Sequence, residues 1–309
     1  LSNNSVCYTE KPDMGIFMKE WLSLYDSKSG ERGIFNRASA QEKARSNGRR
    51  DGDVDFGTNP CCEIILRPYQ FCNLSEVICR AEDTVATLKE KIRLATILGT
   101  FQSTLTDFGY LRKRWKDTTE EERLLGVSLT GIMDCPAVYN AKPETLQELR
   151  NVAVKTNKKL AERLGIKQSA AVTCVKPSGT VSQLVDAASG IHARHNPFYV
   201  RTVRGDNKDP LTMFLKDKGV PAEPDFTAPD SVTVFSFPMK SPEGAVCRYD
   251  MSAIEQLELW LKIADNYCEH KPSVTISVKE HEWLAVGSWC WEHFDSLSGI
   301  SFLPFSDHS

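Results

Sequence analysis

The sequence predicts an α/β fold with largely parallel strands. Three observations support this prediction. Apolar strand candidates alternate with helix candidates over most of residues 124–300, which is typical of parallel strands joined by crossover helices. The segment at residues 124–132 is apolar along most of its length, as a buried strand is. With 309 residues, the chain is long enough to bury a sizeable core in one or two domains.

The individual elements follow from hydrophobic periodicity and from turn residues. Helices are expected at residues 14–25, 38–46, 84–115, 143–164, 180–187, 210–218, 252–270 and 280–297. Gly99 and Gly109 are expected to interrupt the third of these helices. Strands are expected at residues 75–79, 124–132, 170–175, 199–203, 232–237 and 274–278. Residues 1–13 are expected to be irregular or strand-like, and residues 27–33 to form a turn.

Composition limits the classes of function. The net charge of −3 offers no basic field for a phosphate backbone, so we expect no nucleic-acid partner. No apolar run reaches membrane-spanning length, and no signal peptide opens the sequence. Ten cysteines are too sparse for a disulfide scaffold and are expected to be thiols in a reducing cytoplasm. The chain starts at Leu1 without methionine and neither end resembles a polar tail, so we expect a piece of a longer polypeptide.

The stretch that carries the most chemistry is Asn59-Pro60-Cys61-Cys62-Glu63, within a loop over about residues 51–74. Pro60 disfavours a helical conformation at Asn59, which predicts an extended backbone here. Residues two apart in an extended chain share a face, so Asn59, Cys61 and Glu63 are expected to point the same way, with Cys62 turned away. An amide, a thiol and a carboxylate on one face form a possible reaction centre.

Other interpretations of these cysteines remain open from the residues alone. Free cysteines are commonly small buried hydrophobic residues. A zinc site is disfavoured, because Cys61, Cys62 and Cys72 lack the CxxC spacing that chelation favours, and we expect no metal ligands from this chain.

A second stretch, at residues 176–182, predicts an anion-binding turn. It follows a strand and opens a short helix, where free backbone N–H groups attract anions. The candidate phosphate-binding residues are Ser178, Gly179, Thr180, Val181 and Ser182. From the local pattern alone, an ordinary helix N-cap is the better explanation, and the spacing is not that of a Walker A loop.

The loop that contains His192 and His195 offers only two candidate ligands, which disfavours a metal site. Contacts to a substrate phosphate, or an ordinary surface loop, fit it better. Arg201 and Arg204 on the following strand add positive charge nearby.

Residues 57–64 and 71–74 closely resemble the finger-loop signature of ribonucleotide reductases, which reads Asn-Pro-Cys-x-Glu with a second cysteine at the spacing seen here. Residues 2–6, 122–127, 176–180 and 298–304 are similar to class II reductases, above all to the adenosylcobalamin-dependent ribonucleoside-triphosphate reductases. The resemblance implies a ten-stranded α/β barrel made of two five-stranded halves, with the loop threading its centre. Residues 1–309 would be a single fragment that holds the loop and most of the second half.

The resemblance also implies a mechanism. With adenosylcobalamin as cofactor, Cys61 would become a thiyl radical that takes the 3′ hydrogen of a ribonucleoside triphosphate. Glu63 would act as general base on the 3′ hydroxyl, and Asn59 would hold the ribose hydroxyls. Cys72 would be one of two thiols that reduce the substrate and close as a disulfide. The turn at residues 178–182 would hold the substrate phosphates.

Several parts of such an enzyme are not found in this sequence. They are the thiol partner of Cys72, the effector-specificity region, most of the cobalamin platform and the C-terminal cysteine pair that a thioredoxin-like reductant would serve. The N-terminal half of the barrel would have to come from the same gene or in trans. Two alternatives are a catalytic segment of a class I-type reductase with a metal-containing radical partner, and a non-catalytic scaffold half-barrel.

Overall fold

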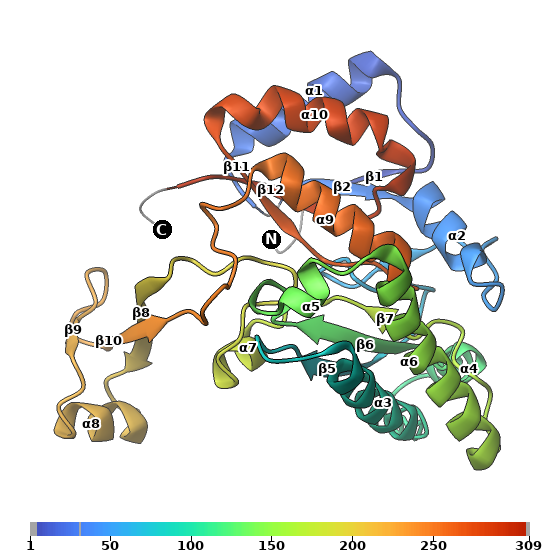
Figure 1. The fold of residues 1–309 in the computed structure, drawn as a ribbon, viewed down its shortest axis with the longest axis horizontal. Coiled ribbons are helices and arrows are strands. Elements are labelled where there is room, and N and C mark those ends of the chain that lie inside the picture. Colours follow the sequence, from blue (N-terminus) through green and yellow to red (C-terminus); the bar gives the residue numbers. More distant parts are fainter. Residues whose placement is uncertain (1–4, 31, 307–309) are drawn as a thin grey trace.

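Two sheets form the centre of the protein in the computed structural model, which describes residues 5–30 and 32–306. The first sheet is parallel and has the order β5-β6-β7, formed by β5 (Asn73–Ile78), β6 (Leu125–Thr130) and β7 (Thr173–Cys174). The second has the order β1-β2-β12-β11, formed by β1 (Val6–Tyr8), β2 (Gly33–Asn36), β12 (Ile300–Pro304) and β11 (Thr275–Val278). The predicted α/β class is confirmed (Figure 1).

The two sheets approach each other beyond β7. Val175 forms a parallel bridge to Pro272, just before β11, so the strands continue from one sheet toward the other. Within the second sheet, β1 runs parallel to β2 and β11 parallel to β12, whereas β2 and β12 are antiparallel. Among the described residues this series does not close into a barrel, and it fits part of one.

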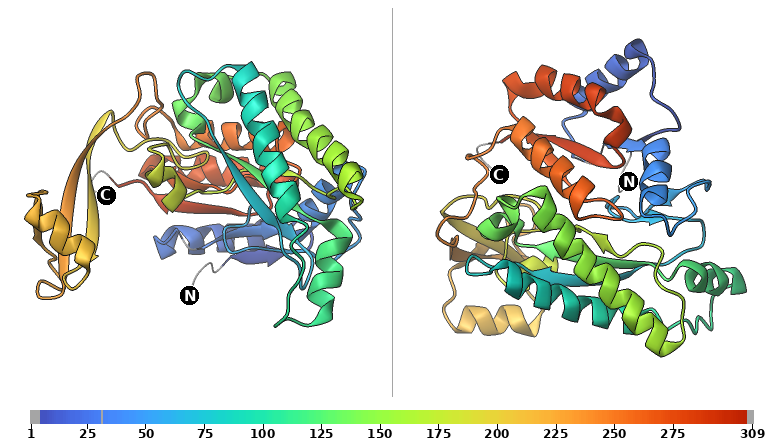
Figure 2. Two further views of the ribbon diagram at one scale, coloured as in Figure 1. Left: turned by 90° about the horizontal axis from the view of Figure 1, so that it is seen from below. Right: turned by 45° about the vertical axis from the view of Figure 1, so that its right-hand side comes forward.

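Helices cover the outer faces of both sheets. Helices α3 (Val85–Gln102) and α6 (Pro143–Leu164) lie side by side against β5 and β6 (Figure 2). Helices α9 (Ala253–Asn266), α10 (Trp283–Glu292) and α1 (Met14–Ser27) belong to the second sheet. The smaller helices are α2 (Arg37–Ser46), α4 (Lys113–Glu122), α5 (Pro136–Tyr139) and α7 (Thr180–Leu184). Five of the expected helices begin within two residues of the predicted start and end within three of the predicted end: α1, α2, α6, α7 and α8 (Pro210–Asp217).

The expected helix at residues 84–115 is in fact two helices, and the predicted interruption at Gly99 is wrong. α3 continues through Gly99, where a Cβ atom would lie 3.2 Å from Leu125 Cδ2. The glycine therefore lets the helix approach β6 closely and does not break it. The chain leaves the helix at Ser103, and Gly109 lies in the connection to α4.

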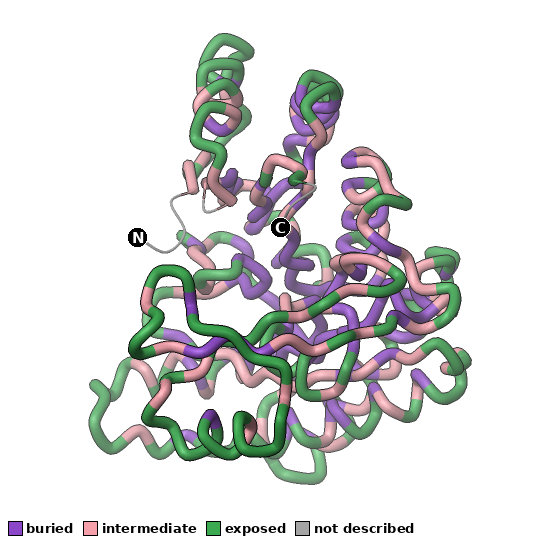
Figure 3. The backbone as a smooth tube through the Cα atoms, turned by 90° about the vertical axis from the view of Figure 1, so that its left-hand side faces the viewer, coloured by how far each residue is buried: buried purple, intermediate pink, exposed green. Residues whose placement is uncertain are grey.

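The expectation of largely parallel strands is wrong for residues 198–240. There β8 (Phe198–Asp206), β10 (Val232–Lys240) and β9 (Ala222–Pro224) form an antiparallel sheet of order β8-β10-β9, with α8 beside it. This arm projects from the rest of the protein (Figure 1), and most of its β8 residues are exposed (Figure 3). A parallel pair needs a crossover that packs on its own sheet, whereas an antiparallel pair does not. The alternation of elements alone could not distinguish the two.

Two further findings concern the ends of the chain and membranes. Part of the segment at residues 2–6, which resembles class II reductases, lies outside the described residues. In the described ranges, no helix combines the length and the apolar character that crossing a bilayer requires.

Candidate active site

A small hairpin closes the cysteine loop. Strands β3 (Gly57–Thr58) and β4 (Ile65–Leu66) pair antiparallel, with Thr58 opposite Ile65. Between them the backbone turns sharply: Cys62 N–H donates to the carbonyl of Asn59 at 2.9 Å, and Ile64 N–H donates to Asn59 Oδ1 at 3.0 Å. Sequence reasoning did not find this hairpin, whose strands have two residues each.

The extended conformation predicted for residues 59–63 is wrong. Cys62 has φ +64°, in the left-handed region, so the two-residue alternation of faces breaks there. A Cβ atom on Gly299 would lie 2.4 Å from Cys62 Cβ, so the turn is in close contact with the start of β12. Since that contact involves a residue distant in sequence, the local pattern could not reveal it. Cys62 is buried, as the prediction that it turns away required.

The base of the loop is fixed by a buried ion pair. The guanidinium of Arg50 donates to both carboxylate oxygens of Glu122, at 3.0 and 2.9 Å, and to the carbonyl of Ile65 at 2.9 Å. Gln70 donates to the same carboxylate and accepts from the N–H of Arg67 at 2.8 Å. Because a bidentate arginine–carboxylate pair has a defined geometry, this network holds both strands of the loop on the body.

Cys61 and Glu63 lie in different environments. Cys61 is exposed and lines a cavity of about 320 Å³, together with Pro60, Pro177, His192, Thr275 and Ser301. Glu63 is completely buried. The two residues therefore do not form one exposed face, although both belong to the same turn.

Glu63 is held by two lysines. Its Oε1 atom lies 2.9 Å from Lys176 Nζ, and its backbone carbonyl accepts the N–H of Lys271 at 3.0 Å. Its Oε2 atom is buried and has no hydrogen-bond partner among the described residues. A buried acceptor without a partner is costly, so this oxygen is suited to a donor that a ligand brings.

Lys176 is a site residue that sequence reasoning missed. Burial lowers the pKa of its ammonium, but the hydrogen bond and charge of Glu63 outweigh burial and raise the pKa overall. Its backbone N–H donates to Ser128 Oγ at 2.8 Å, which fixes the lysine at the end of β7. The only signal in the sequence is its place directly before Pro177 and the candidate phosphate turn.

The thiol of Cys61 is held in its protonated form. Burial raises its pKa, Glu63 raises it further, and Lys176 acts in the opposite direction. A thiol that keeps its proton near neutral pH is a poor nucleophile but retains a hydrogen atom on sulfur. Cys61 is therefore better suited to hydrogen-atom chemistry than to nucleophilic attack.

Cys72 lies apart from the cavity at Cys61. It is half-buried beside an apolar cluster of Leu66, Leu124, Ala170 and Ala171, and burial raises its pKa strongly. No disulfide joins any of the described cysteines.

The candidate phosphate turn divides into buried and exposed residues. Ser178 and Ser182 are buried, and their hydroxyls bond to Thr130 Oγ1 at 2.6 Å and to the carbonyl of Gly179 at 2.7 Å. Gly179, Thr180 and Val181 are exposed, and Gly179 has φ +48°. The two serine hydroxyls thus hold the shape of the turn, and the exposed residues are the part that a ligand can reach.

Glu76 is a second carboxyl group near this turn. It lies on β5 opposite Ser128 of β6, which is in turn opposite Cys174 of β7. Burial raises the pKa of Glu76 to about 7, against the opposing effects of Ser178 and Lys176. Its Oε1 atom is buried without a hydrogen-bond partner in the described part of the chain.

Glu76 should make stability fall as the pH rises toward neutrality. Between its ordinary value of 4.5 and about 7, the folded protein holds a proton that the unfolded chain has lost, so this contribution is present below pH 4.5 and lost through pH 7. We expect the urea midpoint of Glu76→Gln to fall less than that of the parent over this range. The exposed Glu82→Gln is the control, and equal slopes in all three proteins would contradict the assignment.

Comparison with known proteins shows which proteins this chain is similar to. No protein-family model matches the chain. Adenosylcobalamin-dependent ribonucleoside-triphosphate reductases are similar to it over most of its length. The protein from Euglena gracilis is 29% identical over 304 residues, covering 94% of this chain and 41% of that protein. Those from Levilactobacillus brevis and Lactobacillus leichmannii are 25% and 27% identical, covering 99% and 98% of this chain and 44% and 45% of theirs.

Solved structures agree on the fold. A crystal structure of a B12-dependent, class II ribonucleotide reductase has a TM-score of 0.83 at 23% identity, covering 99% of this chain and 47% of that one. The alpha subunit of the Actinobacillus ureae class Id reductase has a TM-score of 0.61 at 16% identity, covering 98% of this chain and 65% of that one. The class of proteins to which the chain is similar in fold and sequence is that of the ribonucleotide reductases. Within it, the resemblance to the adenosylcobalamin-dependent, class II enzymes is confirmed. The chain spans less than half the length of the curated relatives it matches.

Proposed function

We propose that this chain carries the catalytic loop and the phosphate turn of an adenosylcobalamin-dependent ribonucleoside-triphosphate reductase. The observation that carries the proposal is the position of Cys61, an exposed thiol on a cavity, with the buried Glu63–Lys176 ion pair in the same loop region. Residues 1–309 are proposed to be one fragment of the catalytic barrel, completed by an N-terminal half from the same gene or in trans. A cytoplasmic location fits ten cysteines without a described disulfide.

The residue of this chain that suits adenosylcobalamin is Cys61, through its sulfur atom. When bound, that cofactor supplies the radical chemistry that oxidises a cysteine. The pKa of the Cys61 thiol is raised, which favours the form that keeps its hydrogen, and Cys61 lines a cavity that a ligand could enter. Most of the surface that would hold the corrin is assigned to the missing half.

The proposed steps on the substrate are carried out by side chains of the cysteine loop. The Cys61 radical takes the 3′ hydrogen, and Glu63 Oε2 accepts the proton of the 3′ hydroxyl, since Oε1 is already bound to Lys176. Asn59 Oδ1 is occupied by the Ile64 N–H, so its amide N–H is the group that can donate to a ribose hydroxyl. The 2′ hydroxyl leaves as water. Two thiols, one of them Cys72, would supply two electrons and two protons and close as a disulfide, which a thioredoxin-like protein would reduce. Cys61 would then return the hydrogen atom to C3′, which completes the product and restores the thiyl radical.

Access to Glu63 imposes a condition on this mechanism. The carboxyl is fully buried, whereas the side chain of Lys176 is one-third exposed. A substrate can reach Oε2 only if the residues around Glu63 move, and Lys176, which binds Oε1, is one of these residues. The exposed part of the turn, Gly179 to Val181, would receive the triphosphate by backbone N–H groups.

Two alternatives to the class II proposal were open. The class I-type reductase is less well supported than class II, since the class Id alpha subunit matches the fold with a lower TM-score than the class II enzyme. The scaffold alternative is opposed by the preserved set of Asn59, Cys61, Glu63 and Cys72.

The test is deoxynucleotide formation from a ribonucleoside triphosphate, with adenosylcobalamin and a dithiol. The chain is assayed alone and together with a matching N-terminal half. We expect product only from the combination, because the thiol partner of Cys72 is absent from this chain. Product without added adenosylcobalamin would contradict the class II assignment. No product from two folded and associated halves would contradict the proposed activity.

A further inference from the structure

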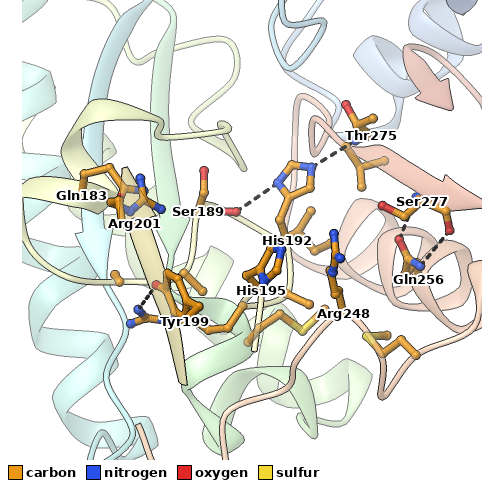
Figure 4. A pocket seen from close by; sticks show the side chains of 18 residues that line it. Gln183, Ser189, His192, His195, Tyr199, Arg201, Arg248, Gln256, Thr275 and Ser277 are labelled. Carbon is orange, nitrogen blue, oxygen red and sulfur yellow. Dashed lines mark hydrogen bonds between the residues drawn. The ribbon is translucent and has the colours of Figure 1, made fainter. Parts of the chain in front are cut away.

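A second cavity, of about 260 Å³, lies where the arm joins the body. It shares His192, Val274 and Thr275 with the cavity at Cys61, so the two are neighbours with a common wall. Its polar lining comes from several segments of the chain (Figure 4). Among the residues of this lining are Gln183, Ser189, His192, Arg194, Arg201 and Arg248.

His192 forms the common wall as a neutral ring. The backbone N–H of Thr275 donates to its Nε2 atom at 3.1 Å, so Nε2 is an acceptor and carries no proton. The other nitrogen, Nδ1, then donates to the carbonyl of Ser189 at 3.0 Å. Burial also lowers the pKa of this ring. His192 therefore braces β11 against the loop at Ser189 and contributes no charge to either cavity (Figure 4).

The charge of the second cavity comes from arginines. Three of them line it, and the lining contains no aspartate or glutamate within the described residues. The charge of Arg194 is already balanced, because it pairs with Asp134 and Asp186 at 2.9 Å each. Arg248 donates to the carbonyl of Ser306 at 2.7 Å and packs on Tyr249.

Arg201 makes no ion pair with any described residue, unlike Arg194. Its Nε atom is buried without a hydrogen-bond partner in the part of the chain that the structure describes. A charged donor shielded from water and left without an acceptor is costly, since such groups are nearly always paired in folded proteins. Its neighbour on the same strand, Arg204, is by contrast paired with Asp225 at 2.7 Å.

We propose that this cavity binds a phosphate group, received by Arg201, of a ligand that extends toward Cys61. The planar guanidinium suits phosphate because it can offer two parallel N–H donors. The volume is slightly below the range of about 300–1,000 Å³ for pockets that enclose a whole drug-sized ligand, so the cavity takes one end of a larger molecule.

Two phosphate-bearing ligands meet this description. Both are ligands of the proposed reductase, so the inference rests on the proposed function. One is the polyphosphate of the ribonucleotide, which would then extend beyond the turn at residues 178–182. The other is the phosphodiester of the cobalamin. Gln183 and Ser189 line the cavity and follow that turn closely in sequence, so either ligand would pass beside α7.

The test is binding to the intact 309-residue chain, measured by titration calorimetry with tripolyphosphate, ATP and adenosylcobalamin as separate probes. We expect Arg201→Gln to weaken binding of at least one probe by about tenfold or more, the usual effect of losing a hydrogen bond to a charged group. Arg201→Lys should keep part of the affinity. The matched control is Lys240→Gln, which removes one exposed charge from the paired strand of the same arm and lies outside the cavity.

The three probes separate the two sources. Weaker binding of tripolyphosphate and ATP assigns the cavity to the nucleotide, and weaker binding of adenosylcobalamin alone assigns it to the cofactor. Gln183→Ala tests a second lining residue if Arg201→Gln does not fold. The proposal is overturned if the parent binds none of the probes, or if the parent and the folded cavity variant bind them all equally. Because binding is read without turnover, a failed reductase assay with intact Arg201-dependent binding would refute the proposed function and leave the anion site standing.

Discussion

Replacing Cys61 by serine is expected to abolish deoxynucleotide formation by the complemented enzyme, with a loss of about a thousandfold or more. The sulfur is the atom proposed to carry the radical, and an O–H group holds its hydrogen far more firmly than an S–H group. The substitution changes one atom at an exposed position, so the fold should be preserved. The measurement is the initial rate of product formation with saturating adenosylcobalamin and dithiol, together with the urea midpoint of each variant.

A matched control exists in the same chain. Cys7 on β1 is also exposed and does not line the cavity at Cys61, so Cys7→Ser should retain the parent rate. An unchanged rate in Cys61→Ser would show that this thiol is not the reacting group, and the scaffold alternative would gain support. Equal losses in both variants would indicate a general effect of thiol removal.

The fold could be predicted from sequence wherever local signals decide the structure. α6 begins at Pro143 and ends before Gly165, whose φ of +66° is the left-handed conformation that glycine favours at a helix end. β6 is buried along all six of its residues, as its apolar sequence indicates. Strand direction in the arm could not be predicted, because the pairing of β8 with β10 depends on contacts that leave no local pattern.

The candidate site shows the same limit. The sequence identified the loop with Cys61 and Glu63 and the turn at residues 178–182 as two separate features, and their catalytic roles stay predictions. It could not show that Glu63 meets Lys176, because the two lie 113 residues apart and only the folded chain brings them together. It also placed Glu63 on one face with Cys61 in an extended chain, whereas Cys62 has a left-handed conformation and Glu63 is buried. The cavity at Arg201 could not be predicted from the sequence either, since its walls come from distant segments of the chain.

Replacing Lys176 by methionine is expected to lower the rate of nucleotide reduction by about a hundredfold to ten-thousandfold, the range attributed to a general base. Lys176 binds Glu63 Oε1, so without the lysine the buried carboxylate loses the partner that holds and balances it in the position of a base. The expected loss of stability is about 2–4 kcal/mol, less than for a fully buried pair because the lysine side chain is one-third exposed. Both effects should be measured on one preparation, by the reduction assay and by urea unfolding.

Two further variants separate the ion pair from simple packing. Lys176→Arg should restore much of the stability, since it keeps the charge. Glu63→Gln/Lys176→Met should be more stable than Lys176→Met alone, because the double variant leaves no charge buried without a partner. If the double variant is instead less stable by the sum of the two single losses, the residues act independently and the ion pair is not what holds Glu63.

The pH dependence of the folding stability gives an independent test of the Glu63–Lys176 ion pair. Because the pKa of Lys176 is raised above its ordinary value of 10.5, the stabilisation from the pair is fully present below that pH and is lost only as the pH rises through the higher value in the folded protein. The parent should therefore lose stability relative to Lys176→Met in strongly alkaline solution, while the difference between them stays constant near neutrality. A difference that already vanishes at neutral pH would mean that the lysine is not protonated in the folded protein. Lys176 could not then serve as the counter-ion that keeps Glu63 a base.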